Sequence, residues 1–289
     1  MNENTEISAL LHLIDDPDEE IFSTVSERIV TYGKGIIPNL ENLWENSPAE
    51  EVQERIEMLI HRLHFSDLVN DFKEWNDSAY QDLLLGALLV ARFQYPDLHT
   101  APVIQEIEKM RRNVWIELNN FLTPLEQTNV ITSIIYNYYN LKGVEVSYSN
   151  PDDFFLHKVI QTKKGNTIAN GILYLILTEL LAIPVKAINI PKQFILAFFT
   201  EEYSSGILHE KPEKKISFYI DATTGKMFTQ NDLTNYFNRI AVTPLPSFFK
   251  PLSHKRIIQL LLQELAKCFD KPLTQYKKDE LLQLAELLS

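Results

Sequence analysis

The spacing of apolar residues predicts that the first quarter of the chain is helical. Apolar positions recur every three or four residues, which is the pattern of an amphipathic helix with one buried face. A first helix is expected up to about residue 14. A second is expected after Asp16, because aspartate caps helices and Pro17 fits the first helical turn. The apolar stripe of this second helix consists of Ile21, Val25 and Ile29.

A short pattern in this second helix occurs again 31 residues later. The run PDEEI at 17–21 aligns with PAEEV at 48–52. The same register pairs three apolar positions of the two copies: Val25 with Ile56, Ile29 with Ile60, and Ile37 with Leu68. A repeat of this length with a proline-acidic helix start resembles HEAT-type helical pairs, which stack because one pair cannot bury its own apolar face. We therefore expect a HEAT-like unit at residues 1–75; chance similarity of two amphipathic helices is the alternative.

After a polar stretch near residues 73–78, the pattern predicts more helices. They are expected at residues 83–91, 103–118, 127–139 and 154–160, and near the end of the chain at 257–269 and 279–288. The run at residues 167–181 is apolar on nearly every face. Such a helix belongs at the centre of a domain.

Three runs rich in β-branched and aromatic residues follow this apolar helix. They predict antiparallel strands at Val185–Ile190, residues 194–200 and Ile216–Ile220. The polar segment at residues 201–215 is expected to be a hairpin loop outside the core. The chain is therefore expected to have an α+β fold, mostly helical, with a buried helix against a small antiparallel sheet.

Composition and charge narrow the possible functions. The chain has 289 residues, of which 45% are hydrophobic, and a net charge of −12, which disfavours nucleic acid as a partner. The first ten residues lack a basic start and an apolar core, and no run is long enough to span a membrane, so we expect a cytoplasmic protein. The single cysteine, Cys268, rules out an intramolecular disulfide.

Metal ions and nucleotide cofactors have little basis in the sequence. His61 and His64 are three residues apart on a predicted helix, but no third ligand is apparent nearby, so we expect no metal site. Glycine-rich phosphate-binding motifs are absent, so no cofactor is expected.

The candidate chemistry lies around the apolar helix. Residues 165–174 read GNTIANGILY and residues 180–185 read LLAIPV. Papain-like and transglutaminase-like folds present their nucleophile at the start of a buried helix that faces a short sheet, where the helix dipole stabilises a thiolate. The two runs resemble the glycine, cysteine, helix and "GIP" sequence of the transglutaminase-like superfamily.

Further segments resemble the bacterial SirB-type branch of that superfamily. They are the YPD run at 95–97, the KKGNT run at 163–167, the PKQF run at 191–194 and the Asp-Ala pair at 221–222. The resemblance covers about residues 83–232, and the closing helices resemble the branch's tetratricopeptide-like tail. It implies a transglutaminase-like domain at residues 79–250 and a tetratricopeptide-like helical pair at residues 251–289.

The resemblance also implies where a catalytic triad would lie. Thr167 falls at the position of the family's cysteine, Gln193 at its histidine and Asp221 at its aspartate. A threonine hydroxyl needs an adjacent base, and a glutamine amide cannot act as one. Asn166 and Phe194 are possible pocket residues. Equally, Thr167 or Asn166 could simply cap the helix, and Asp221 could form a turn before Gly225.

These substitutions predict a non-catalytic protein that binds a ligand or regulates a partner, most plausibly a protein or peptide. Two alternatives remain open at this stage. The first is an acyl-transfer enzyme or amide hydrolase that uses Thr167 as nucleophile with a base the sequence does not reveal. The second is a structural assembly scaffold. A base close to Thr167 would favour the enzyme, and a cleft closed by side chains would favour the scaffold.

Overall fold

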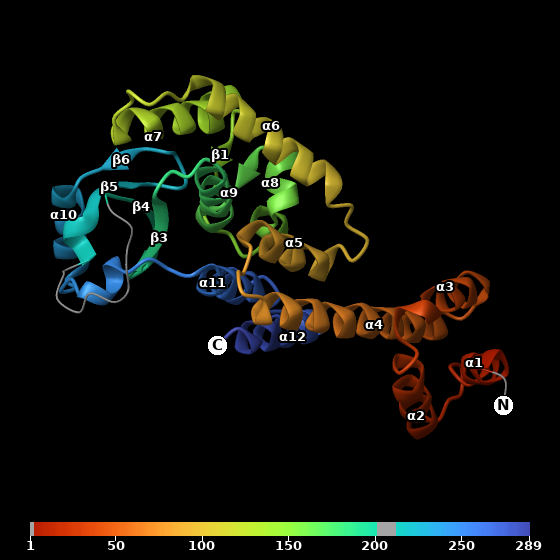
Figure 1. The fold of residues 1–289 in the computed structure, drawn as a ribbon. Helices are drawn as coiled ribbons and strands as arrows, with labels where there is room; N and C mark the ends of the chain where they lie inside the picture. The colour runs from red at the N-terminus through yellow and green to blue at the C-terminus, as the bar shows by residue number, and fades with distance from the viewer. Residues whose placement is uncertain (1–2, 201–211) are drawn as a thin grey trace. The chain divides into compact units, whose positions relative to one another are not determined.

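A computed structural model describes residues 3–200 and 212–289 and divides the chain into two compact units, Met1–Glu74 and Trp75–Ser289 (Figure 1). As the sequence predicts, the fold is α+β and mostly helical. Most of the expected hairpin loop, residues 201–211, lies outside the described residues.

The first unit is formed by α1 (Glu3–His12), α2 (Glu19–Val30), α3 (Ile37–Asn46) and most of α4 (Glu50–Asp77). The cap of α2 differs from expectation. Asp18, not Asp16, is the N-cap, and its side chain accepts a hydrogen bond from the Glu20 N–H at 2.8 Å. Asp16 lies two residues before the cap, and its Oδ1 accepts a hydrogen bond from the Asp18 N–H at 2.9 Å.

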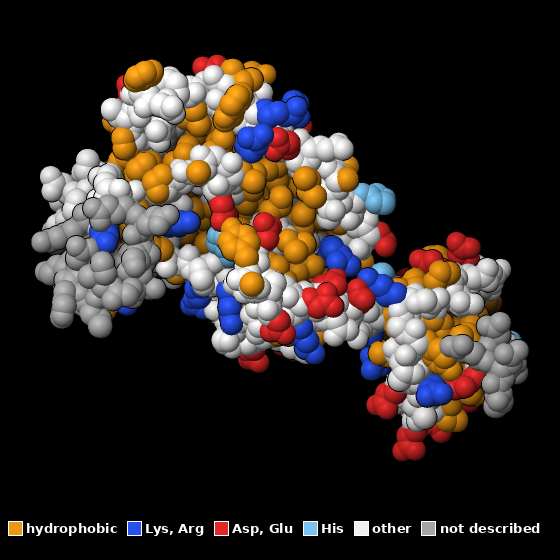
Figure 2. All heavy atoms as spheres, viewed as in Figure 1, with side chains coloured by type: hydrophobic (Ala, Val, Ile, Leu, Met, Phe, Trp, Pro, Cys, Tyr) orange, Lys and Arg blue, Asp and Glu red, His pale blue; other side chains and the backbone are white. Residues whose placement is uncertain are grey.

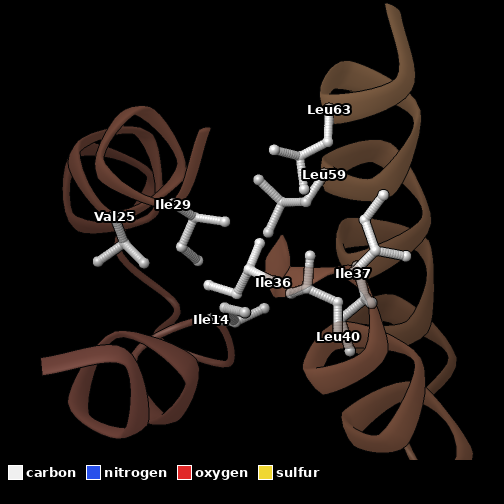
Figure 3. Packing of buried hydrophobic residues seen from close by; sticks show 9 residues of the cluster. Ile14, Val25, Ile29, Ile36, Ile37, Leu40, Leu59 and Leu63 are labelled. Carbon is white, nitrogen blue, oxygen red and sulfur yellow. The ribbon is translucent and has the colours of Figure 1, made fainter. Parts of the chain in front are cut away.

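The core of the first unit joins the two copies of the sequence pattern (Figure 3). Val25 and Ile29 on α2 and Ile56 on α4 are buried in one cluster, and Ile60 packs against it. Arg55 on α4 also bonds to the start of α2. Its guanidinium donates to the Asp16 carbonyl at 2.6 Å and pairs with Glu19 at 2.9 Å. The two apolar stripes therefore meet, as the sequence predicts.

The expectation of two helical pairs is wrong for the second copy. In the first copy the helix ends near Thr31, Gly33 has a φ of 66°, and Pro38 lies in the first turn of α3. The second copy has His64, Ser66 and Val69 at the positions of Gly33, Gly35 and Pro38, and α4 continues through them without a break. Glycine and proline are the residues that interrupt helices, so their absence leaves one long helix.

The second unit contains the remaining helices and the sheet. Its helices are α5 (Leu83–Gln94), α6 (Ala101–Glu117), α7 (Pro124–Thr132), α8 (Leu156–Thr162), α9 (Thr167–Leu180), α10 (Gln230–Ile240), α11 (His254–Ala266) and α12 (Gln275–Leu287). The sheet consists of β3 (Val185–Ile190), β4 (Gln193–Phe199), β5 (Ile216–Ile220) and β6 (Met227–Phe228) in the order β3-β4-β5-β6, all antiparallel. A separate parallel pair joins β1 (Lys142–Gly143) to β2 (Lys164–Gly165).

The three predicted strands are observed within one residue of their expected ends, whereas α10 and β6 were not predicted. The closing helices α11 and α12 belong to the same compact unit as the sheet. On the visible face of the second unit, some apolar side chains remain exposed over α6 and α7 (Figure 2); among the most exposed are Trp115, Ile116 and Phe121.

The helix α9 is the centre of the second unit. Every residue from Ile168 to Thr178 is buried, and the helix packs against α5, α6, α8, β3 and β4 (Figure 1). Gly171 permits the closest approach to the sheet, because a Cβ at this position would lie 2.6 Å from the Phe194 ring. The strand β4 is buried on both faces, and α10 covers the face opposite α9 through Leu233 and Phe237.

A buried histidine on α8 leads us to expect that the stability of the second unit depends on pH. His157 is 2% exposed, packs edge-on against Tyr95 at a ring distance of 4.7 Å, and has no hydrogen-bond partner for its Nδ1. Burial lowers the pKa of His157 to about 4. Below about pH 6.5 the unfolded chain therefore binds a proton that the folded chain excludes.

We predict that the free energy of unfolding falls between pH 6.5 and pH 4.5, and that His157→Phe removes part of this decrease, by up to about 3 kcal/mol. Phenylalanine keeps the ring packing and removes the unpartnered nitrogen. Urea unfolding of the full chain at several pH values measures the effect. The exposed His99 provides the control variant, His99→Phe, which should keep the wild-type slope. An unchanged slope in His157→Phe would contradict the prediction.

Candidate functional site

A cavity of about 1150 Å³ lies where the start of α9 meets one end of the sheet. Its wall comes from several parts of the chain: Thr167 and Ile168 of α9, the β3–β4 and β5–β6 turns with their flanking residues, the segment around Tyr148, Phe248, and α11 with Lys267 after it. All of these elements belong to the second unit. The cavity is therefore built by a single compact part of the chain.

The structure brings the three predicted triad positions to this one cavity. Thr167, Gln193 and Asp221 all contribute to its wall, although they are far apart in the sequence. Phe194, expected as a pocket residue, also lines it. Asn166 does not line it and is completely buried.

Asn166 caps the buried helix, which decides between the two capping candidates. Its Oδ1 accepts hydrogen bonds from the N–H groups of Ile168 and Ala169, each at 3.0 Å. These bonds satisfy backbone donors that would otherwise be buried at the helix start. Thr167 is the first residue of α9, and its hydroxyl instead shares a hydrogen bond of 2.8 Å with the hydroxyl of Thr223.

Asp221 holds the turn between β5 and β6. Its Oδ1 accepts from the Thr223 N–H at 2.8 Å and its Oδ2 accepts from the Thr224 hydroxyl at 2.7 Å. Its backbone carbonyl accepts from the N–H of Gly225 at 2.7 Å. Both carboxylate oxygens are thus used within the turn, which matches the turn-forming alternative for this residue.

Thr223 and Gly143 are site residues that sequence reasoning missed. Thr223 connects the Asp221 turn to Thr167, and Gly143 packs directly against it, since a Cβ at Gly143 would overlap the Thr223 side chain and carbonyl. Tyr136 supports the turn from another side by donating to the Ala222 carbonyl at 2.6 Å. Burial raises the pKa of Tyr136, which keeps its hydroxyl a neutral donor.

A second group of polar side chains joins α11 to the segment around Tyr148. The Tyr148 hydroxyl donates to Glu264 Oε2 at 2.7 Å, and Lys267 Nζ pairs with Glu264 Oε1 at 2.6 Å. The Lys267 ammonium also lies 5.4 Å from the Tyr148 ring. The hydrogen bond to Glu264 raises the pKa of Lys267, so the lysine stays charged.

The nucleophile position therefore has a hydroxyl for a neighbour rather than a base. Among the described residues, the hydrogen-bond partner of the Thr167 hydroxyl is Thr223. The one thiol of the chain, Cys268, is half-buried, and burial raises its pKa to about 11. A thiol with so high a pKa is almost fully protonated near neutral pH and is a poor nucleophile.

The described residues contain no group of three or more His, Cys, Asp or Glu side chains placed to share a metal ion. Within the same residues, no helix combines the length and the apolarity needed to cross a membrane.

A buried helix whose first residue faces the end of an antiparallel sheet is the arrangement of papain-like and transglutaminase-like domains. The family model of the transglutaminase-like superfamily matches residues 101–263, which is more than half of the chain. The chain therefore belongs to the transglutaminase-like superfamily.

Curated relatives are distant. A UPF0162 protein of Xylella fastidiosa strain Temecula1 is 25% identical over 130 residues, which cover 42% of this chain and 45% of that protein. The F-box only protein 21 of Mus musculus is 28% identical over 68 residues, which cover 24% of this chain and 11% of that protein. The matches thus span less than half of each relative. The comparison with solved structures found no match.

We predict that Asp221 acts mainly on stability. Asp221→Ala removes both side-chain hydrogen bonds of the turn and should lower the free energy of unfolding by about 1–2 kcal/mol, while Thr223→Val, which removes one hydroxyl bond, should cost about 1 kcal/mol. Thr223→Ser keeps the hydroxyl and is the matched control. Urea unfolding of the full chain measures all three. An Asp221→Ala variant as stable as the wild type would show that the turn does not depend on this carboxylate.

Proposed function

We propose that this protein is a non-catalytic member of the superfamily whose cavity binds a protein or peptide partner. One observation carries the proposal: the cavity is open, yet the hydroxyl at the nucleophile position is bonded to another hydroxyl, Thr223 Oγ1 at 2.8 Å. Nucleophilic catalysis by threonine requires a base that accepts its proton. A neutral hydroxyl does not supply one.

The other two triad positions support the same proposal. An amide such as Gln193 has no basic lone pair near neutral pH, so it cannot move a proton. Asp221 already accepts hydrogen bonds on both of its carboxylate oxygens. The Thr167 hydroxyl bonds to Thr223 rather than to this carboxylate.

The cavity also favours binding over a purely structural role. A scaffold needs no internal space, whereas about 1150 Å³ is at least as large as the cavities that hold drug-sized ligands. We assign the role of partner surface to the cavity rather than to the acidic helical exterior.

The finer family assignment is also a proposal. The SirB-type assignment rests on the YPD, KKGNT and PKQF runs. The tetratricopeptide-like assignment of the tail is supported by the antiparallel packing of α11 and α12, in which Gln259 Nε2 donates to the Ala285 carbonyl at 2.9 Å. The HEAT-like assignment rests on the shared core of α2 and α4. We place the protein in the cytoplasm.

Restoring the missing groups tests the proposal. In a Cys268→Ala background, Thr167→Cys places a thiol at the start of α9, and adding Gln193→His supplies an imidazole across the cavity. We expect iodoacetamide to alkylate the double variant about tenfold faster near pH 7 than Thr167→Cys alone, because a neighbouring imidazolium lowers the thiol pKa. Thr167→Cys with Gln193→Ala is the matched control and should react like the single variant.

The unmodified protein should show no transglutaminase, protease or amidase turnover. Turnover that Thr167→Ala abolishes would overturn the non-catalytic proposal. Equal alkylation rates in the single and double variants would instead show that position 193 does not face position 167, and the triad correspondence would be wrong.

A further inference from the structure

Two lysines stand at the same end of the sheet, one on each hairpin turn. Lys192 lies in the two-residue turn that joins β3 to β4, since Ile190 pairs with Gln193. Lys226 lies in the turn that joins β5 to β6. The strands are antiparallel and adjacent in order, so these two turns come to the same sheet end as the start of α9. Both lysines line the cavity.

The carboxylates of the cavity are already engaged, whereas these lysines are not. Asp221 uses both oxygens in its turn, and Glu264 uses both with Tyr148 and Lys267. Lys192 and Lys226 are exposed and form no ion pair within residues 3–200 and 212–289. Their ammonium groups are therefore available to a ligand.

Two amide side chains of the cavity can pair with either donors or acceptors of a ligand. Asn189 and Gln193 are exposed at its wall and supply further N–H groups. The cavity lining carries three lysines and two carboxylates, a formal net charge of +1, which favours a ligand rich in carboxylate oxygens. The cavity attracts acidic groups although the whole chain has a net charge of −12. An acidic ligand is therefore attracted to the cavity and repelled by the rest of the surface.

The size and lining of the cavity point to a peptide rather than a small acid. Its volume of about 1150 Å³ exceeds the upper end of typical small-molecule sites, about 1,000 Å³. Apolar side chains stand between the polar groups, among them Val146, Met227, Phe228 and Leu260. A short extended chain offers both kinds of contact, because successive side chains alternate in direction.

We infer that the cavity binds an extended acidic peptide segment, whose carboxylates pair with Lys192 and Lys226 while neighbouring apolar side chains pack on its wall. The inference rests on the proposed function, since it names the kind of peptide that the proposed binding cavity takes.

A substitution at Lys192 can remove the charge of the side chain without disturbing the fold. Its φ of 65° lies in the left-handed region, which glycine adopts freely and lysine does not. Lys192→Gly therefore removes the ammonium group while keeping the turn. Its thermal unfolding temperature should equal or exceed that of the wild type, so lost binding in this variant cannot be explained by lost structure.

The test uses the full chain and a fluorescein-labelled eight-residue peptide in which Glu alternates with Val or Leu. A matched peptide with Gln in place of Glu is the neutral control. By fluorescence anisotropy, we expect saturable binding of the Glu peptide that weakens as salt is added, and at least tenfold weaker binding of the Gln peptide. Lys192→Gly and Lys226→Ala should each weaken binding by about three- to fivefold, as expected for exposed ion pairs. Lys271→Ala, at an exposed lysine outside the cavity, should leave it unchanged.

Equal affinity for the Glu and Gln peptides, or no effect of either lysine variant, would overturn the inference. So would a result in which inorganic phosphate or glutarate binds in a lysine-dependent way but the Glu peptide does not, since the cavity would then be a small-anion site. Mass spectrometry of the recovered peptide separates the two proposals. Cleavage or modification that depends on Thr167 would overturn the non-catalytic function and leave acidic peptide recognition standing.

Discussion

The second unit depends on one helix that is buried on every side along most of its length and begins inside the protein. The residues of α9 from Ile168 to Thr178 are all buried, so helices and strands must surround it. Its first N–H groups cannot reach water, and a buried unpaired donor is costly. Asn166 satisfies two of them. The same geometry directs Thr167, the next residue, into the cavity at the sheet end.

Structural and chemical requirements are separate at this site. The helix start needs a cap, which Asn166 supplies, and the β5–β6 turn needs an acceptor, which Asp221 supplies. Neither task requires a nucleophile or a base. A threonine can therefore occupy position 167, with its hydroxyl paired to Thr223, without weakening the framework of the transglutaminase-like fold.

Sequence patterns predicted most of the helices and strands, because buried elements have apolar patterns that can be recognised in the local sequence. The three long strands and the apolar helix were found from β-branched runs and from a segment without a polar face. The short β6 and the exposed α10 were missed, although the capping box of Thr229 and Asp232 before Leu233 and Phe237 is a usable signal. The capping residue was uncertain because Asn and Thr are adjacent and both cap well.

The cavity itself was beyond prediction, because its chemistry depends on which polar groups are already paired. Lys192 and Lys226 are ordinary turn lysines in the sequence, and the cavity also contains Lys267 and two carboxylates, Asp221 and Glu264. Only the folded structure reveals that both carboxylates accept hydrogen bonds, whereas Lys192 and Lys226 form no ion pair with any other described residue. A general base needs an unpaired lone pair that can accept a proton, whereas recognition of an acidic ligand needs hydrogen-bond donors without a partner. Within the described residues, the groups of this cavity that have no partner meet the second requirement.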